Sequence, residues 1–430
     1  MSLLFPPLSR RGLVGTGTLG LLGAGLARPA AAAGPQPPQP ADIGRVENGR
    51  VTFPNWKGEA DRPSPPPPAP LPPGQRVGFA LVGLGRLSLE ELLPAFGECR
   101  RARPVALVSG TPEKARAVAE QYGIRREAIY DYASFDSIRD NPDIQVVYVV
   151  LPNGMHHEFT LRAARAGKHV LCEKPMANTA AEAQEMVEAC RAAGVKLMVA
   201  YRCQHEPYNR QAVDLLRAGE LGRPRFMEAM NTQVQGEVAQ WRFSKALAGG
   251  GALPDIGLYC LNAARFYSGE EPVEVFARID SPRDDPRYRE VEESMAFMLR
   301  FPSGLIANCA CSYGAHESKD LRVRLEKGWI DVENAFAYRG QSLRLARRVG
   351  KAEGIEERRL GQRNQFAAEM DHMAQCVLAG RAPRTPGEEG LQDHRVMEAL
   401  YERARSGGPV GLPAVAGPDA TRGPGLEEEG

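Results

Sequence analysis

The stretch Val77-Gly78-Phe79-Ala80-Leu81-Val82-Gly83-Leu84-Gly85-Arg86 decides the fold of this chain. A run typical of a buried strand leads into a G-x-G loop, and a helical pattern over residues 89–99 follows. Gly83 permits the tight turn out of the strand, and Gly85 lets the backbone approach a pyrophosphate at the helix N-terminus. The third small position of the loop falls on Ser88. This order predicts a dinucleotide site whose loop is Gly83, Leu84, Gly85 and Arg86.

Strand and helix patterns continue to alternate over residues 76–202. Further strands are expected at 104–108, 144–151, 169–172 and 196–200, and the clearest helices at 111–122 and 180–193. Alternation of this kind implies a doubly wound parallel sheet. The N-terminal half of the folded body is therefore predicted to be an α/β Rossmann domain.

Residues 203–410 have a different pattern. Alternating strand-like runs are expected at 273–279, 294–301, 305–312, 321–325 and 329–332, separated by glycine-containing turns. Two helices, 365–378 and 391–404, are predicted to close this second domain. The tail over residues 411–430 is rich in glycine, proline and glutamate, so we expect it to be disordered.

Composition narrows the classes of function. The 430 residues are 43% hydrophobic and 25% charged, which is typical of a globular protein of about two domains. A formal net charge of +1 gives no global field that would recruit nucleic acid or an acidic membrane. The eight cysteines have no CxxC pair and no zinc-finger spacing, so no metal site is predicted. We interpret them as small core residues rather than disulfides.

The N-terminus resembles an export signal. Ser9-Arg10-Arg11-Gly12-Leu13 is followed by a weakly apolar run over 13–26 and by small residues over 30–33. This layout predicts a signal peptide over residues 1–33, and the paired arginines favour the twin-arginine route to the periplasm. The apolar run is too short and too rich in glycine to span a bilayer. The alternative is a disordered basic tail.

A proline-rich arm is predicted over residues 34–75. Runs such as Pro65-Pro66-Pro67-Pro68 exclude helix and central strand and favour extended polyproline conformations. The arm is either a flexible spacer or a segment that lies on another surface, such as a neighbouring subunit. In the second case Phe53, Pro54 and Trp56 would anchor it. Composition leaves both interpretations open.

The end of the second strand distinguishes the two nicotinamide cofactors. An NAD site normally offers a carboxylate there to the ribose 2′-hydroxyl. The sequence over residues 107–114 has no acid at the strand end, whereas Ser109 can donate to a 2′-phosphate and Lys114 can supply a cation. These residues predict NADP. The alternative is that Lys114 is a solvated helix residue paired with Glu113 or Glu120.

Candidate catalytic residues lie in two places. Lys174, in Cys172-Glu173-Lys174-Pro175, follows a buried strand, and Pro175 restricts its backbone to extended conformations. Such a lysine can polarise a substrate oxygen; the alternative is a solvated surface lysine. Asp255 and Tyr259 lie four residues apart in a predicted helix, so both can face one cleft. We expect the ammonium of Lys174 to lower the pKa of Tyr259, which makes the phenol a proton shuttle.

Several motifs occur together in one order: Leu151-Pro152-Asn153 with His156, Glu173-Lys174-Pro175, Tyr201-Arg202-Cys203, Gln240-Trp241-Arg242, Ala248-Gly249-Gly250-Gly251, Asp255-Ile256-Gly257-Leu258-Tyr259 and Pro386-Gly387-Glu388-Glu389-Gly390. In these motifs the chain resembles the glucose–fructose oxidoreductase branch of the Gfo/Idh/MocA family, from about residue 77 to 410. The resemblance implies that Lys174 and Tyr259, beside Asp255, are catalytic. It implies cofactor contacts from Ser109, Lys114, Tyr132, Leu151, Pro152, Asn153, His156, Glu173, Lys174, Arg202, Trp241, Arg242 and Tyr338.

The resemblance also implies a C-terminal α+β domain with a large, mostly antiparallel sheet whose face makes subunit contacts in a homo-oligomer, a dimer or tetramer. The activity it implies is that of an exported enzyme. Hydride passes between C1 of an aldose and tightly bound NADP, Tyr259 takes the hydroxyl proton, Lys174 steadies the oxyanion, and a second sugar reoxidises the cofactor.

The chain departs from the sugar-transfer enzymes at Gln204-His205-Glu206-Pro207-Tyr208. The family enzyme has histidine, an aromatic residue and aspartate at the first three positions and methionine at the last. We expect substrate choice to be made here, so an aldose–aldose oxidoreductase and a plain NADP-dependent aldose dehydrogenase stay open. Two non-enzymatic alternatives are a periplasmic sensor of sugars or nucleotides and a surface protein that uses the proline-rich arm.

Overall fold

The computed structural model describes residues 45–47, 50–52, 69–236, 239–408, 410–415 and 417–425. The predicted signal peptide and most of the predicted arm lie outside these residues. Up to Pro63 the described part is a two-stranded antiparallel sheet, β1 (Arg45–Glu47) and β2 (Arg50–Thr52). This pair lies in a stretch of the arm without proline, so no N–H of its ladder is lost to a proline ring.

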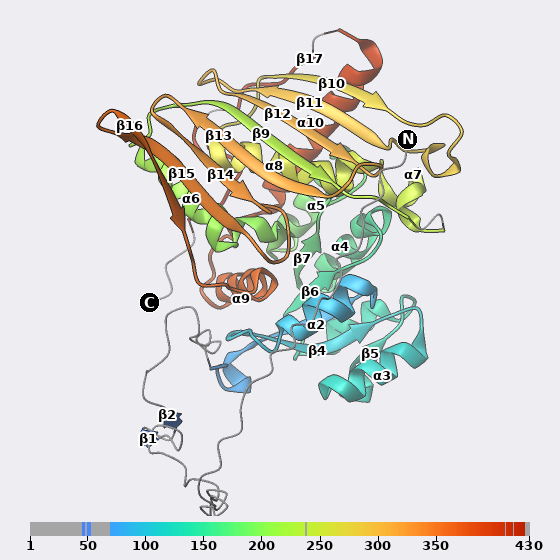
Figure 1. Cartoon of the computed structure of the whole chain (residues 1–430). Helices are drawn as coiled ribbons and strands as arrows, with labels where there is room; N and C mark the ends of the chain where they lie inside the picture. The colour runs from blue at the N-terminus through green and yellow to red at the C-terminus, as the bar shows by residue number, and fades with distance from the viewer. Residues whose placement is uncertain are drawn as a thin grey trace, which may run out of the picture. The chain divides into compact units, whose positions relative to one another are not determined.

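A six-stranded parallel sheet organises the first half of the body (Figure 1). Its order is β5–β4–β3–β6–β7–β8, so the order reverses at the central strand β3, which carries the glycine loop. Every residue of β3 is buried, as expected of a strand covered on both faces. The predicted Rossmann domain is confirmed. Its strands are β3 (Val77–Val82), β4 (Ala102–Val108), β5 (Ile129–Tyr130), β6 (Val146–Val149), β7 (His169–Glu173) and β8 (Leu197–Ala200).

Helices connect these parallel strands. The main ones are α3 (Pro112–Tyr122), α4 (His156–Arg165) and α5 (Ala180–Ala192), the last with a capping box of Thr179 and Glu182. The helix after the glycine loop is shorter than the predicted range of 89–99. It consists of a π-helical turn, Ser88–Leu92, and α2 (Leu93–Ala95). Pro94 has no N–H to donate within it, and Gly97 weakens its continuation.

A nine-stranded sheet organises the second half, with the order β16–β15–β14–β13–β9–β12–β11–β10–β17. Only β9 and β12 pair in parallel among its described strands, so the predicted, mostly antiparallel sheet is confirmed. Its strands are β9 (Pro224–Thr232), β10 (Glu274–Asp280), β11 (Ser294–Arg300), β12 (Ile306–Ser312), β13 (Ser318–Leu325), β14 (Gly328–Glu333), β15 (Ser342–Val349), β16 (Ala352–Arg358) and β17 (Val410–Gly411).

The central strand β9 was not predicted from the sequence. Its inward residues Met227 and Ala229 are buried, but its outward residues Phe226 and Met230 are also large and apolar. The alternation of polar and apolar residues that identifies a half-buried strand is therefore hidden. The edge strand β16 and its neighbour β15 were missed as well. In β16 four of the seven residues are charged and Ile355 is its one large apolar residue, so the same signal is absent there.

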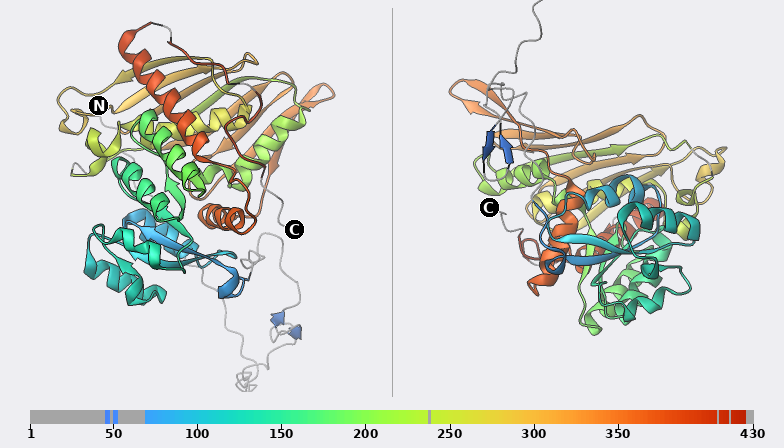
Figure 2. Two further views of the ribbon diagram at one scale, coloured as in Figure 1. Left: turned by 180° about the vertical axis from the view of Figure 1, so that it is seen from behind. Right: turned by 90° about the horizontal axis from the view of Figure 1, so that it is seen from below.

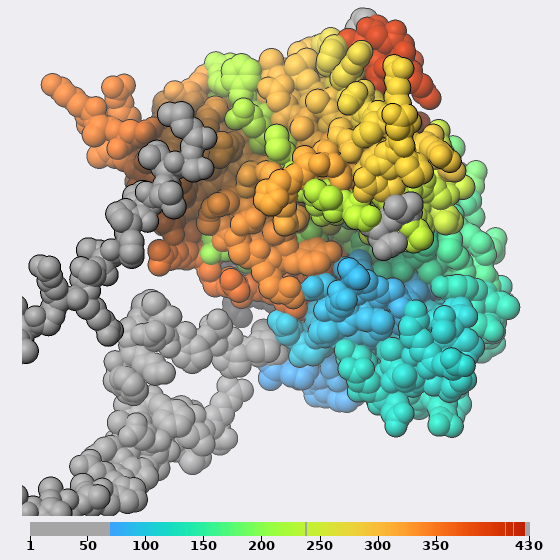
Figure 3. All heavy atoms as spheres, turned by 45° about the vertical axis from the view of Figure 1, so that its right-hand side comes forward, coloured from blue at the N-terminus to red at the C-terminus, as the bar shows by residue number. Residues whose placement is uncertain are grey.

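Helices cover one face of the nine-stranded sheet. Among them, α6 (Pro207–Ala218) packs on β14 and β15, α8 (Leu258–Ser268) on β9 and β12, and α10 (Gly387–Ser406) on β10. The view from behind, on the left of Figure 2, shows α10 in red along the sheet. In the space-filling view the blue-to-green first half lies against the yellow-to-orange second half (Figure 3).

Helix α9 (Gln365–Leu378) corrects one prediction, because it packs on β3 and β4 of the Rossmann domain rather than closing the second domain. Asp371 of α9 accepts three backbone N–H groups at the start of β4. Its two carboxylate oxygens bind the amides of Arg100 at 2.7 Å, Arg101 at 2.7 Å and Ala102 at 3.0 Å. The parallel sheet is therefore covered in part by a helix from the C-terminal part of the chain.

The prediction for the C-terminal tail is also corrected. We expected disorder from residue 411, but β17 pairs with β10, and residues 417–425 lie on the body. Thr421 donates to Glu389 at 2.7 Å, and Arg422 pairs with the same carboxylate at 3.1 Å. The physical reason is charge: Glu389 is fully buried and needs hydrogen-bond donors that the tail supplies.

Candidate active site

A cavity of about 870 Å³ opens at the carboxyl ends of the parallel strands and reaches the face of the second sheet. This is where ligands bind in open α/β sheets, and the volume suits a small-molecule site. The structure brings together every residue predicted for the site. They are Gly83, Leu84, Gly85, Arg86, Ser109, Lys114, Tyr132, Leu151, Pro152, Asn153, His156, Glu173, Lys174, Arg202, Trp241, Arg242, Asp255, Tyr259 and Tyr338.

The glycine loop fits a dinucleotide. Gly83 has a φ of 97°, and a Cβ added there would lie 2.2 Å from the carbonyl oxygen of Val150. A Cβ on Gly85 would meet nothing within 4 Å, so the backbone at this position is open to the cavity. Ser88, the unusual third residue, is buried and donates to the Gly83 carbonyl at 2.6 Å. The Ser88 side chain therefore holds the turn through a hydrogen bond to the Gly83 carbonyl, which a glycine at this position could not make.

The corner beyond β4 holds the two residues predicted to select NADP. The Ser109 oxygen accepts the Thr111 N–H at 3.1 Å, which leaves its hydroxyl proton free to be donated into the cavity. Lys114 lines the same corner, and among the described residues no ion pair joins it to Glu113 or Glu120. This cation is not neutralised by its helix neighbours.

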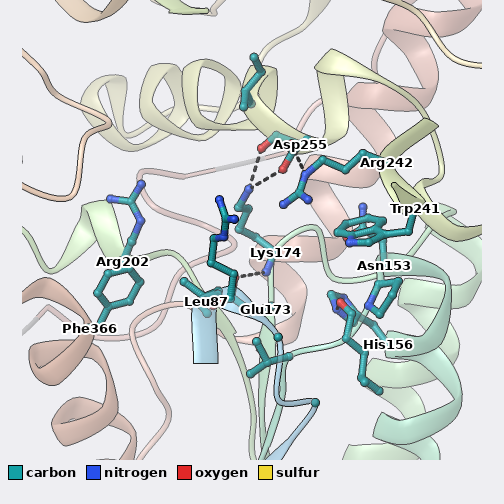
Figure 4. Close-up of a pocket in the computed structure, with 18 of the residues that line it drawn as sticks. Leu87, Asn153, His156, Glu173, Lys174, Arg202, Trp241, Arg242, Asp255 and Phe366 are labelled. Atoms are coloured by element: carbon teal, nitrogen blue, oxygen red, sulfur yellow. Dashed lines mark hydrogen bonds and ion pairs between the residues drawn. The ribbon is translucent and has the colours of Figure 1, made fainter. Parts of the chain in front are cut away.

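Lys174 and Asp255 form the centre of the site (Figure 4). The Lys174 ammonium donates to the Asp255 carbonyl at 2.6 Å and approaches its Oδ1 at 3.4 Å. Asp255 Oδ2 accepts from Arg242 Nε at 2.9 Å and from the Tyr313 hydroxyl at 2.8 Å. Burial opposes the charge of this carboxylate, but Arg242 and Lys174 outweigh burial and hold the pKa of Asp255 below its usual value. Asp255 is therefore a fixed anion that orients two cations.

Tyr259 behaves differently from its prediction. The Lys174 ammonium lies over the face of the Tyr259 ring, 4.5 Å from the ring centroid. The hydrogen bonds of that ammonium go to Asp255 and not to the Tyr259 hydroxyl. Burial raises the pKa of Tyr259 above its usual value, and the neighbouring Arg202 offsets this only in part. The expected lowering by Lys174 was wrong. The phenol is neutral here, so it can accept a proton only while it passes its own proton on.

Arg202 forms one wall of the cavity. Its guanidinium donates to the Phe336 carbonyl at 2.7 Å and to Gln365 Oε1 at 2.6 Å, and it is buried. It also lies 4.8 Å from the ring centroid of Tyr259 and 4.5 Å from that of Tyr338. These contacts fix the two phenol rings beside the cavity.

Three of the predicted cofactor residues also support the loops of the site. The ring nitrogens of His156 lie 2.8 Å from the carbonyls of Leu151 and Pro175, and burial lowers its pKa. Asn153 donates to the Ala248 carbonyl at 2.9 Å. Glu173 Oε2 accepts the backbone N–H of Lys174 at 3.2 Å, which holds the backbone of that residue.

Sequence reasoning missed the side of the cavity made by the second sheet. Asn231 of β9 donates to the Ile256 carbonyl at 3.0 Å, and Lys319 of β13 pairs with Glu317. No motif marks these positions, and β9 itself was not predicted. The further residues missed are Leu87, Gly110, Thr111, Val150, Ala200, Gln233, Ile256, Phe336, Ala337 and Phe366.

Gln204 and His205 do not line this cavity, so the expectation that substrate is selected there was wrong. Gln204 is 1% exposed and donates to Asn262 Oδ1 at 3.0 Å, and His205 is buried against the ring of His372. The segment follows β8 directly, and it turns into the interior rather than toward the substrate side.

Other features of the described residues concern metal ligands, cysteines and membrane spans. No group of three or more His, Cys, Asp or Glu side chains is arranged to hold a metal ion there. Seven of the eight cysteines are buried, which supports their interpretation as core residues. In the part of the chain that the structure describes, no helix has the length and apolar character needed to cross a membrane.

Comparison with known proteins identifies the class. The model of an oxidoreductase family with an NAD-binding Rossmann fold matches residues 77–201, and the GFO/IDH/MocA C-terminal domain matches residues 209–331. A D-xylose 1-dehydrogenase [NADP(+)] of Haloarcula marismortui is 33% identical over 78% of this chain and 93% of its own length. The chain therefore belongs to the Gfo/Idh/MocA family of oxidoreductases.

Solved structures agree with this assignment. The aldose–aldose oxidoreductase of Caulobacter crescentus, complexed with glycerol, has a TM-score of 0.76 and 47% identity over 78% of this chain and all of that chain. A 3-ketoreductase mutant of Actinomadura kijaniata, in complex with TDP-benzene and NADP, has a TM-score of 0.68 and 26% identity over 76% and 97% of the two chains.

Proposed function

We propose that this chain is an exported, NADP-dependent aldose oxidoreductase whose tightly bound cofactor is reoxidised by a second sugar. One observation carries the proposal. Lys174, Asp255 and Tyr259 meet in a cavity whose far corner offers Ser109 and Lys114, rather than a carboxylate, to the ribose of a dinucleotide.

The residues divide the work as follows. Gly83 and Gly85 would hold the pyrophosphate of the dinucleotide, and Ser109 and Lys114 would hold its 2′-phosphate. NADP, when bound, supplies the hydride acceptor. Lys174, aimed by Asp255, stabilises the negative charge that develops on the C1 oxygen of the aldose.

Tyr259 takes the proton of that hydroxyl as its own proton is passed on, and oxidation of the aldose gives the aldonolactone.

The relatives support a sugar on each side of the reaction. The D-xylose 1-dehydrogenase supports an aldose as hydride donor, and the 47% identical aldose–aldose oxidoreductase supports an aldose as the acceptor. Export rests on Arg10 and Arg11 and on the small residues before residue 34, all outside the described residues. Tight binding suits export, because an exported enzyme has no cytoplasmic NADP pool to draw on. We also propose a homo-oligomer that uses the outer face of the nine-stranded sheet.

The decisive experiment is mass spectrometry of the nucleotide released from purified protein, followed by a panel of aldoses and ketoses tested without added cofactor. NADP or NADPH should be released, and a sugar pair should turn over with no nucleotide in the buffer. Protein purified without nucleotide that needs added NADP for every turnover would instead be a plain NADP-dependent dehydrogenase. Release of NAD would overturn the roles given to Ser109 and Lys114.

A further inference from the structure

A run of three glycines, residues 249–251, lies just before the residue at the centre of the site. It leads into a π-helical turn, Leu253–Gly257, which carries Asp255. The run leaves no room for side chains, because a Cβ on Gly251 would lie 1.9 Å from the carbonyl oxygen of Glu292. The chain that enters the turn therefore lies directly against the backbone of Glu292.

The N–H groups at the start of this turn need acceptors that a helical turn does not supply itself. The N-cap residue is Ala252, whose methyl side chain cannot accept a hydrogen bond. Glu292 supplies the acceptors instead. Its Oε2 accepts the N–H of Gly251 at 2.9 Å, its Oε1 accepts that of Leu253 at 2.8 Å, and its carbonyl accepts that of Ala252 at 3.2 Å. Since Pro254 has no N–H, Glu292 accepts every N–H of this stretch.

Glu292 is itself fixed and lies outside the active-site cavity. The Tyr401 hydroxyl of α10 donates to the same Oε1 at 2.9 Å, and Glu292 is 6% exposed. It lines a second cavity of about 690 Å³ and is not one of the described residues that line the active-site cavity. Glu292 can therefore act on the reaction only through the turn that it binds.

The backbone of this turn determines where the catalytic ammonium lies. Lys174 Nζ donates to the carbonyl of Asp255 at 2.6 Å, a shorter contact than the 3.4 Å to its carboxylate (Figure 4). A displacement of the turn would therefore displace the ammonium from the oxygen on which it acts. A misplacement of about 1 Å in an active site can lower the rate about a hundredfold.

We propose that Glu292 is a positioning residue of the active site. It holds the backbone of Asp255, and through it the ammonium of Lys174, at the place where negative charge develops on the sugar oxygen. The inference rests on the proposed function. A carboxylate is needed for this role because each of its two oxygens accepts an N–H. A glutamine of the same size would turn its own NH2 group toward one of these donors.

The test uses Glu292→Gln, with Glu206→Gln as the matched control. Glu206 is 3% exposed, and its carboxylate also accepts two N–H groups at the start of a helix, those of Tyr208 at 3.0 Å and Asn209 at 2.8 Å. None of the described residues that line the active-site cavity lies on that helix, α6. If Glu292 had only a structural role, the two variants would behave alike.

The holoenzyme of each form is mixed with the aldose that reacts fastest in the panel described above. Reduction of the bound cofactor is followed by its absorbance in a single turnover, at a temperature where circular dichroism shows all forms folded. Glu206→Gln should stay within about twofold of the wild-type rate. Glu292→Gln should reduce its cofactor at least about tenfold more slowly at saturating sugar, with an unchanged half-saturating sugar concentration.

The outcomes are separable. A wild type whose cofactor no aldose reduces overturns the proposed function and the role of Glu292 with it. A wild type that reacts overturns this inference alone if Glu292→Gln is as fast as Glu206→Gln, or if only its half-saturating sugar concentration rises.

Two further measurements keep the inference testable. If Glu292→Gln does not fold, Tyr401→Phe replaces it, because this change removes one donor to the carboxylate and leaves both N–H contacts. We expect a slowing of about threefold at saturating sugar, and the wild-type rate contradicts the inference. A crystal structure of Glu292→Gln gives a readout independent of activity. The Lys174 Nζ should lie beyond about 3.5 Å from the Asp255 carbonyl, and an unchanged contact contradicts the inference.

Discussion

At the scale of single residues, the proposed contact of Lys114 with the 2′-phosphate gives the sharpest test of how the cofactor is chosen. If Lys114 binds the 2′-phosphate as proposed, Lys114→Ala should weaken NADP binding and leave NAD binding unchanged, because NAD lacks that phosphate. The loss should be about tenfold, since solvent screens the exposed charge of the lysine. The measurement is calorimetric titration of nucleotide-stripped protein with each cofactor. Lys351→Ala, which removes an exposed lysine from a distant turn, is the control. An equal loss for NAD and NADP would contradict the assignment.

Single residues also mark the limit of what sequence can predict. All residues that the motifs predicted for the site line one cavity, because glycine loops and strand ends have fixed places in this fold. They did not give the direction of a side chain. Lys174 was expected to act on the Tyr259 hydroxyl, yet its ammonium turns to the Asp255 carbonyl, and burial decides the pKa of the phenol.

At the scale of elements, α9 packs a C-terminal part of the chain on β3 and β4, the first strands of the Rossmann sheet. Asp371→Ala should lower the free energy of unfolding by about 2–4 kcal/mol, since it leaves three backbone N–H groups without their charged acceptor. Urea denaturation measures the loss. Asp140→Ala, at an exposed position, should change stability by less than about 0.5 kcal/mol. A loss at Asp371 no larger than at Asp140 would mean that α9 is not held through this carboxylate.

Helices and strands whose apolar residues follow one clear period were predicted well. Those whose apolar residues follow no clear period were not. The buried strands of the Rossmann sheet and the helices α3, α5 and α9 were placed to within a few residues. The strand β9 was missed because both of its faces carry large apolar residues. The packing partner of α9 was also not predictable. The apolar pattern of the helix shows that one face is buried, but it does not show which element covers that face.

At the scale of the whole molecule, the outer face of the nine-stranded sheet carries a patch of two apolar pairs, Phe226 with Ile306 and Met230 with Ala310, on either side of the polar pair Glu228 and Asn308 in the register of β9 and β12. Phe226 and Met230 are 50% and 45% exposed. Phe226→Glu should convert the proposed oligomer to a monomer, because a charge buried in an apolar interface is costly. Light scattering after size-exclusion chromatography measures the mass. Val349→Glu, at an exposed apolar position outside the patch, is the control; a single monomeric mass for the wild type would contradict the proposal.

The place of β9 in the sheet has a consequence for the order in which the chain folds. Its neighbours β12 and β13 begin at Ile306 and Ser318, far along the chain from Pro224, and α9 reaches back from residue 365 to the first strand of the Rossmann sheet. Folds that depend on such long-range pairings form slowly, because the closure of long loops precedes their contacts. The nine-stranded sheet is complete, and the parallel sheet is covered by α9, only after nearly all of the chain has been synthesised. The export route that we propose from Arg10 and Arg11 carries folded proteins, so it would give such a chain time to fold before it leaves the cytoplasm.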